Sequence, residues 1–85
     1  MEPLVTMYST VWCGYCQRLK KQLNEYGVTY SEVDIEKHPE AVQIVEEVNE
    51  GNQTVPTLVF ADGYAMTNPS LQAVLSKLDE LESAK

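Results

Sequence analysis

Two cysteines separated by two residues have the clearest chemical potential in this chain of 85 residues. Cys13 and Cys16 lie in the segment Trp12-Cys13-Gly14-Tyr15-Cys16, and the sequence holds no third cysteine. Thiols at this spacing can exchange with a disulfide, form a permanent structural disulfide, or supply half of a zinc site. The segments around the pair distinguish these three uses.

The cysteine pair lies where a predicted strand ends and a predicted helix begins. Residues 4–8 form a short β-prone run, and the apolar pattern takes a helical period after Gly14. The predicted helical stripe consists of Cys16, Leu19, Leu23 and Tyr26, with Gly27 as the expected C-terminal cap. Unpaired backbone N–H groups and the helix dipole therefore favour a thiolate at Cys13, whereas Cys16 lies one turn inside on the buried stripe.

This position favours a redox role over the structural alternatives. Zinc takes four ligands, but the chain has two cysteines and one histidine, His38, so a closed zinc site within one chain is disfavoured and we expect no metal. No apolar run approaches the ~20 residues that span a bilayer, and residues 1–3 do not resemble a signal peptide. We expect a cytoplasmic chain without a membrane span, in which a permanent disulfide is disfavoured.

The remaining segments predict a single α/β domain over residues 1–85. The expected elements are strands at 28–35, 57–61 and 64–67, a tight turn at 62–63, and helices that open at Pro39 and at the N-cap Asn68 followed by Pro69. The expected buried positions of these helices are Ala41, Ile44, Val45 and Val48, then Leu71, Val74, Leu75, Leu78 and Leu81. The order is βαβαββα, with a parallel first strand pair, an antiparallel hairpin and helices on both sheet faces.

The charge balance excludes one class of partner. Six basic and thirteen acidic residues give a net charge of −7, whereas nucleic-acid binders normally present a basic surface. Seven of the acidic residues lie between Glu32 and Glu50, while Arg18, Lys20 and Lys21 follow the cysteine pair. The overall charge therefore says little about the surroundings of the thiols.

A second motif precedes the third predicted strand. In Thr54-Val55-Pro56 the proline removes a backbone donor from the sheet. If the bond before Pro56 is cis, Val55 offers its backbone N–H and C=O to an extended thiol substrate beside Cys13. The alternative is that Pro56 merely begins an edge strand.

Together these motifs resemble the glutaredoxin family of the thioredoxin superfamily over essentially the whole chain. Within it, residues 12–16, Gly51-Asn52 before residues 54–56, residues 60–63 and Thr67-Asn68-Pro69 look most like the actinobacterial mycoredoxins. The resemblance implies a thioredoxin fold, a four-stranded mixed sheet flanked by three helices. It also implies a thiol groove, formed by Trp12, Tyr15, Gln53, Thr54, Val55, Pro56, Thr67 and Asn68.

The departures from glutathione-using glutaredoxins replace charged groups by neutral ones. Thr10 stands where those proteins usually have lysine, Gln53 where arginine is frequent, and Asn68 where aspartate is usual. Mycothiol, an acetylcysteine on a sugar-inositol scaffold, lacks the charges that such groups would bind in glutathione. Each position has an alternative: Thr10 ends a strand, Gln53 is a solvated loop residue, and Asn68 is a helix cap.

The resemblance implies a monomeric enzyme that reduces protein–mycothiol mixed disulfides, with Cys13 as nucleophile and Cys16 resolving or dispensable. Mycothiol would be the reducing co-substrate, regenerated by mycothione reductase and NADPH, with no bound cofactor. One alternative is a dithiol redoxin reduced directly by a thioredoxin-reductase-type flavoprotein. Others are a dimer bridging a [2Fe–2S] cluster and an inactive binding module, which the intact cysteine pair disfavours.

Overall fold

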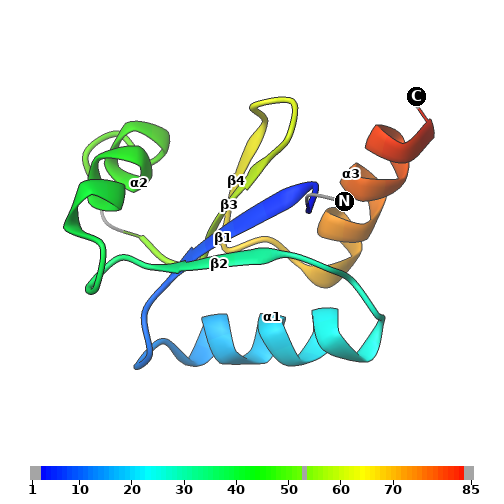
Figure 1. Ribbon diagram of the computed structural model, residues 1–85, viewed down its shortest axis with the longest axis horizontal. Helices are drawn as coiled ribbons and strands as arrows, with labels where there is room; N and C mark the ends of the chain where they lie inside the picture. Colours follow the sequence, from blue (N-terminus) through cyan, green and yellow to red (C-terminus); the bar gives the residue numbers. More distant parts are fainter. Residues whose placement is uncertain (1–2, 53, 84–85) are drawn as a thin grey trace.

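Strands and helices follow one another in the predicted order (Figure 1). The computed structural model describes residues 3–52 and 54–83. Its elements are β1 (Val5–Ser9), α1 (Gly14–Glu25), β2 (Ser31–Asp34), the 3₁₀ turn η1 (Pro39–Ala41), α2 (Val42–Val48), β3 (Thr57–Phe60), β4 (Ala65–Thr67) and α3 (Leu71–Ser83). In these two described ranges, no helix is long and apolar enough to cross a membrane.

Within the described residues the strands form one four-stranded mixed sheet in the order β2-β1-β3-β4. β1 runs parallel to β2, with Tyr8 opposite Val33, and antiparallel to β3, with Tyr8 opposite Thr57. β4 returns antiparallel to β3. The predicted parallel pair, the predicted hairpin and the thioredoxin-like fold are therefore confirmed.

The helices cover both faces of this sheet, as predicted, and each face has its own apolar cluster. The larger cluster joins the sheet to α1 and α3 through Val5, Met7, Leu58, Phe60, Leu19, Leu23, Val74 and Leu78. The smaller one, on which α2 packs, contains Ile35, Ala41 and Val45, with Tyr8, Val33, Val42 and Val55 against it. Figure 1 shows α2 and α1 on opposite sides of the sheet.

The predicted start of the last helix is wrong by two residues. Asn68 does not cap α3, because its φ of 44° turns the chain into the left-handed region before the helix begins. The cap is Ser70, whose Oγ accepts a hydrogen bond from the Ala73 N–H at 3.2 Å. Pro69 consequently lies outside the helix.

Three other local predictions also need correction. Tyr26 is exposed, because α1 ends at Glu25 and the chain turns outward at Tyr26. Ile44 is exposed, since the tighter 3₁₀ turn before α2 leaves the buried face centred between Val42 and Val45. The strand predicted at residues 28–35 is formed only by residues 31–34.

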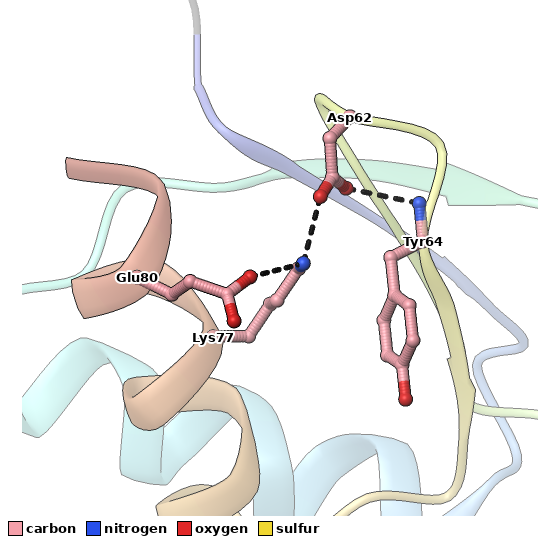
Figure 2. Close-up of polar contacts among 4 residues, drawn as sticks. All are labelled: Asp62, Tyr64, Lys77 and Glu80. Atoms are coloured by element: carbon pink, nitrogen blue, oxygen red, sulfur yellow. Dashed lines mark hydrogen bonds and ion pairs between the residues drawn. The ribbon is translucent and has the colours of Figure 1, made fainter. Parts of the chain in front are cut away.

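An ion-pair cluster ties the tip of the β3–β4 hairpin to α3 (Figure 2). Lys77 Nζ lies 2.7 Å from Asp62 Oδ2 and 2.6 Å from Glu80 Oε2, and 4.6 Å from the centroid of the Tyr64 ring. Asp62 Oδ1 also accepts a hydrogen bond from the Tyr64 N–H. The Lys77 side chain is only 10% exposed. The hydrogen bond from Lys77 lowers the pKa of Asp62, and the two carboxylates raise the pKa of Lys77.

Replacing Asp62 by Asn is expected to lower the free energy of unfolding at neutral pH and to lose that effect in acid. The folded-state pKa of Asp62 is below the ordinary aspartate value of ~3.9, so its contribution is complete above that value. It disappears as the pH falls through the lowered folded-state pKa. Urea unfolding followed by circular dichroism between neutral pH and about pH 2 measures this.

Asp79→Asn, a change at another exposed aspartate, on α3, is the matched control for Asp62→Asn. If Asp62→Asn has the same effect on stability at every pH, the hairpin is not held by the ionised Asp62 carboxylate.

Candidate active site

Cys13 occupies the N-cap of α1. Its backbone is extended, with φ −81° and ψ 111°, and its Sγ accepts a hydrogen bond from the Cys16 N–H at 3.2 Å. The Cys13 N–H in turn donates to the Thr10 carbonyl at 3.4 Å, which closes the turn between β1 and α1. A sulfur at an N-cap faces backbone N–H groups and the positive end of the helix dipole.

The second cysteine lies in a different environment. Cys16 is 0% exposed, and its burial, followed by the hydrogen bond with Cys13, raises the pKa of its thiol to about 12. The thiol of Cys16 therefore stays protonated at neutral pH. Cys13 is 5% exposed. Both are free thiols, and they differ in solvent access and in local electrostatics.

The sheet topology brings the Thr54-Val55-Pro56 loop next to Cys13. Because β1 and β3 are antiparallel and Tyr8 pairs with Thr57, the loop that follows β1 lies beside the loop that precedes β3. The Val55–Pro56 peptide bond is cis, the condition on which the sequence-based hypothesis depended. The Cys13 Sγ lies 3.7 Å from the Val55 carbonyl oxygen, to which the thiol donates.

The same loop is fixed on both sides of Val55. The Thr54 carbonyl accepts a hydrogen bond from Thr57 Oγ1 at 2.7 Å, and the Pro56 carbonyl accepts one from the Asn68 N–H at 2.8 Å. The structure therefore brings Asn68 into contact with the loop formed by Thr54, Val55 and Pro56. Of the other predicted groove residues, Gln53 lies outside the described residues.

A shallow groove adjoins α1 and the start of α3. It has a volume of about 320 Å³ and includes the predicted residues Tyr15 and Asn68. Its lining residues are Tyr15, Arg18, Leu19, Gln22, Asn68, Pro69, Ser70 and Leu71. Trp12 and Tyr15 are 70% and 65% exposed, so both aromatic rings next to the cysteines are open to a partner.

Thr10 is buried rather than exposed to a ligand. Its hydroxyl oxygen has no hydrogen-bond partner among residues 3–52 and 54–83. Thr10 directly follows β1, and its carbonyl, rather than its side chain, contacts the cysteine segment by accepting from the Cys13 N–H.

Sequence and structure comparisons place these features in a known group. The sequence model of the Glutaredoxin family matches residues 5–64. The chain belongs to the glutaredoxin family. It is 53% identical over 74 residues to a glutaredoxin of Mycobacterium tuberculosis, covering 87% of this chain and 88% of that protein. It is 42% identical over 77 residues to Mycoredoxin 1 of Corynebacterium glutamicum, covering 91% and 95%.

Solved glutaredoxins share the fold. A glutaredoxin from Methanosarcina mazei superposes with a TM-score of 0.75 at 26% identity, covering 89% of this chain and 78% of that one. One from Brucella melitensis gives 0.69 at 27%, covering 94% and 88%. The predicted similarity to glutaredoxins and mycoredoxins is confirmed, and the chain is a glutaredoxin-like thiol oxidoreductase.

The structure adds polar residues that sequence reasoning missed. Asn49, at the C-cap of α2, accepts a hydrogen bond from the hydroxyl of the predicted groove residue Thr67. Lys20 forms a 2.8 Å ion pair with Glu32, which also accepts a hydrogen bond from Ser9 Oγ at 2.8 Å. The partners Asn49 and Thr67, and Ser9 and Glu32, are 18 or more positions apart in the sequence. Lys20 and Glu32 lie on the consecutive elements α1 and β2. No local spacing in the sequence signals them.

Iodoacetamide at neutral or mildly alkaline pH is expected to modify Cys13 and to spare Cys16 in the folded chain. Cys13 retains 5% exposure next to the exposed Trp12 and Tyr15, whereas Cys16 is 0% exposed and has a pKa of about 12. Intact-mass analysis with peptide mapping checks this. In Cys13→Ser, alkylation of Cys16 should stay slow until the pH is strongly alkaline. The reason is that burial, the largest cause of the raised pKa of Cys16, remains in this variant.

The complementary variant for the alkylation experiment is Cys16→Ser, which should be modified at the native rate. Equal rates of modification at both thiols of the folded native chain would contradict this assignment of environments.

Proposed function

We propose that this glutaredoxin-family chain reduces protein–mycothiol mixed disulfides by a monothiol mechanism. The observation that carries the proposal is the asymmetry of the thiols: Cys13 at the helix end beside the Val55 carbonyl, Cys16 buried with a raised pKa. The similarity to Mycoredoxin 1 supports mycothiol as the thiol. The protein would act in the cytoplasm as a monomer, on mycothiolated proteins.

The reaction consists of two exchanges. The Cys13 thiolate attacks the mycothiol sulfur of the mixed disulfide, and the protein sulfur leaves as a thiolate that takes a proton from water. A second mycothiol thiolate attacks the mycothiol sulfur now bound to Cys13, which releases the Cys13 thiolate and forms the disulfide mycothione. A mycothione reductase then reduces mycothione with two electrons from NADPH.

The residues around Cys13 supply binding and charge stabilisation. At the N-cap, the Cys16 N–H points at the Cys13 sulfur, so the charge regenerated there in the second exchange has a donor already in place. The backbone of Val55 would pair with an extended thiol compound, while Trp12 and Tyr15 would contact its exposed side. Thr54, Pro56, Thr67 and Asn68, with Gln53, would complete a neutral groove suited to hydroxyl-rich mycothiol.

Cys16 is not needed in this route. Attack by Cys16 on the Cys13–mycothiol disulfide requires its thiolate, and burial suppresses ionisation of that thiol at neutral pH. An incoming mycothiol, ionised in solvent, does not meet this obstacle. A Cys13–Cys16 disulfide would then be a side product.

Cys13→Ser is expected to reduce de-mycothiolation about a thousandfold or more, since no other residue supplies the nucleophile. Cys16→Ser should retain roughly half the activity or more, because the second mycothiol resolves the intermediate. Turnover is measured by NADPH consumption with mycothiol and mycothione reductase. The dithiol mechanism would be favoured instead by two results together: Cys16→Ser loses activity, and a thioredoxin-reductase-type flavoprotein sustains turnover of the native chain without mycothiol.

Intact-mass analysis of Cys16→Ser tests which thiol is preferred. After exposure to mycothione or to oxidised glutathione in parallel, the mycothiol adduct on Cys13 is expected to form faster. The reason is that the predicted groove residues, Trp12, Tyr15, residues 53–56, Thr67 and Asn68, carry no charge, so the charged groups of glutathione find no ionic partner among them. Cys13→Ser controls for modification elsewhere. Faster formation of the glutathione adduct would overturn the choice of mycothiol while leaving the thiol-exchange assignment intact.

A further inference from the structure

The side-chain amide of Asn49 joins three elements around the thiol groove. Its Nδ2 donates to the Val45 carbonyl at 2.8 Å, within α2, and to Thr57 Oγ1 at 3.0 Å, at the start of β3. Its Oδ1 accepts from the hydroxyl of Thr67, at the end of β4. One half-buried amide therefore contacts the end of α2, the start of β3 and the end of β4.

The chemistry of the partners determines which atom donates and which accepts in each hydrogen bond of Asn49. The Val45 carbonyl can only accept, so the amide must present its NH₂ to it, and Oδ1 then faces the Thr67 hydroxyl. Thr57 gives its only hydroxyl proton to the Thr54 carbonyl at 2.7 Å, so it must accept from Asn49. The chain of donors thus runs from Thr67 through Asn49 and Thr57 to Thr54, with every proton used.

The two ends of this chain are proposed walls of the thiol groove. Thr54 precedes Val55, whose carbonyl oxygen lies 3.7 Å from the Cys13 sulfur. Thr67 precedes Asn68, whose N–H holds the Pro56 carbonyl at 2.8 Å. Thr57 is fully buried, so its hydroxyl has no water to replace a lost partner. Asn49 therefore adds a side-chain link between the loop of residues 54–56 and the end of β4, alongside the backbone hydrogen bond between Asn68 and Pro56.

We infer that Asn49 is a positioning residue for the thiol groove, acting on the binding of the disulfide substrate rather than on the chemistry at the Cys13 sulfur. The inference rests on the proposed function in so far as the groove binds a thiol compound. Asn49 would hold the backbone of residues 54–56 at the spacing that an extended disulfide substrate needs beside Cys13. It does not itself touch the reacting sulfurs.

Asn49→Asp is the sharpest test, because it keeps the size of the side chain while it removes both donors and adds a negative charge for which a second variant controls. A carboxylate can still accept from Thr67, but it meets the Val45 carbonyl and the Thr57 oxygen with lone pairs. The loop of residues 54–56 should then move relative to β4. We expect KM for a peptide–mycothiol mixed disulfide to rise about fivefold or more, with kcat changed less than about twofold.

Asn52→Asp is the matched control. It is the same chemical change in the next loop, at an exposed side chain whose Nδ2 donates, among residues 3–52 and 54–83, only to the Asn49 carbonyl at 3.2 Å. Its KM and kcat should stay within about twofold of the native values. Equal increases in KM for both variants would mean that negative charge alone weakens binding, and would overturn the inference.

A second readout does not depend on turnover or on the identity of the thiol. In ¹H–¹⁵N spectra of the free protein, the backbone amide signals of Thr67 and Asn68 should shift in Asn49→Asp and much less in Asn52→Asp. If the substrate thiol is not mycothiol, these spectral shifts should still occur. The rise in KM should then be seen with the mixed disulfide that the native chain does turn over. Unmoved amide signals, or an unchanged KM with that disulfide, would overturn the inference.

Asn49→Ala covers the possibility that the aspartate variant does not fold. It also removes both donors, without adding a charge, and should raise KM while leaving the rate of Cys13 alkylation by iodoacetamide near the native value. Loss of the folded state in both variants, seen by circular dichroism, would assign Asn49 to folding alone and overturn its role in positioning.

Discussion

The site depends on one hydrogen-bonded position, the sulfur of Cys13 at the N-terminus of α1. Backbone N–H groups at a helix start lack partners within the helix, and here the Cys16 N–H meets the Cys13 sulfur at 3.2 Å. The helix that provides these donors also carries Cys16 into the core, where burial raises the pKa of its thiol. A single helix start thus gives the two thiols different environments: a backbone donor faces the Cys13 sulfur, and burial keeps the Cys16 thiol protonated.

The sheet supplies the second half of the site. Antiparallel pairing of β1 and β3 places the end of one strand beside the start of the other, so loops 42 residues apart in sequence meet at Cys13 and Val55. The larger apolar cluster packs β1 and β3 against α1 and α3, and the smaller one packs Tyr8 of β1 and Val55 of the loop before β3 against the α2 side. Packing of the core therefore helps to set the distance between Cys13 and the backbone proposed to present its substrate.

Local signals made the architecture and the cysteine pair predictable, because period, turn residues and motif spacing are short-range properties. The wrong predictions have short-range causes as well. The 3₁₀ turn before α2 leaves Ile44 outside the buried face, and the left-handed backbone of Asn68 makes Ser70 the N-cap of α3. Asn49 could not be predicted. Its partners Thr57 and Thr67 are joined to it only by the folded sheet, and asparagine near a helix end is ordinary.

The two ends of the β3–β4 hairpin are held by different chemistry. Asp62 and Lys77 hold the tip by charge, which titrates, whereas Asn49, Thr57 and Thr67 hold the base by neutral hydrogen bonds, which do not titrate near neutral pH. The neutral group lies at the end that carries the proposed thiol groove. Because its amide and hydroxyl groups do not ionise near neutral pH, the hydrogen bonds at the base of the hairpin do not change with pH in the way the Asp62–Lys77 ion pair does.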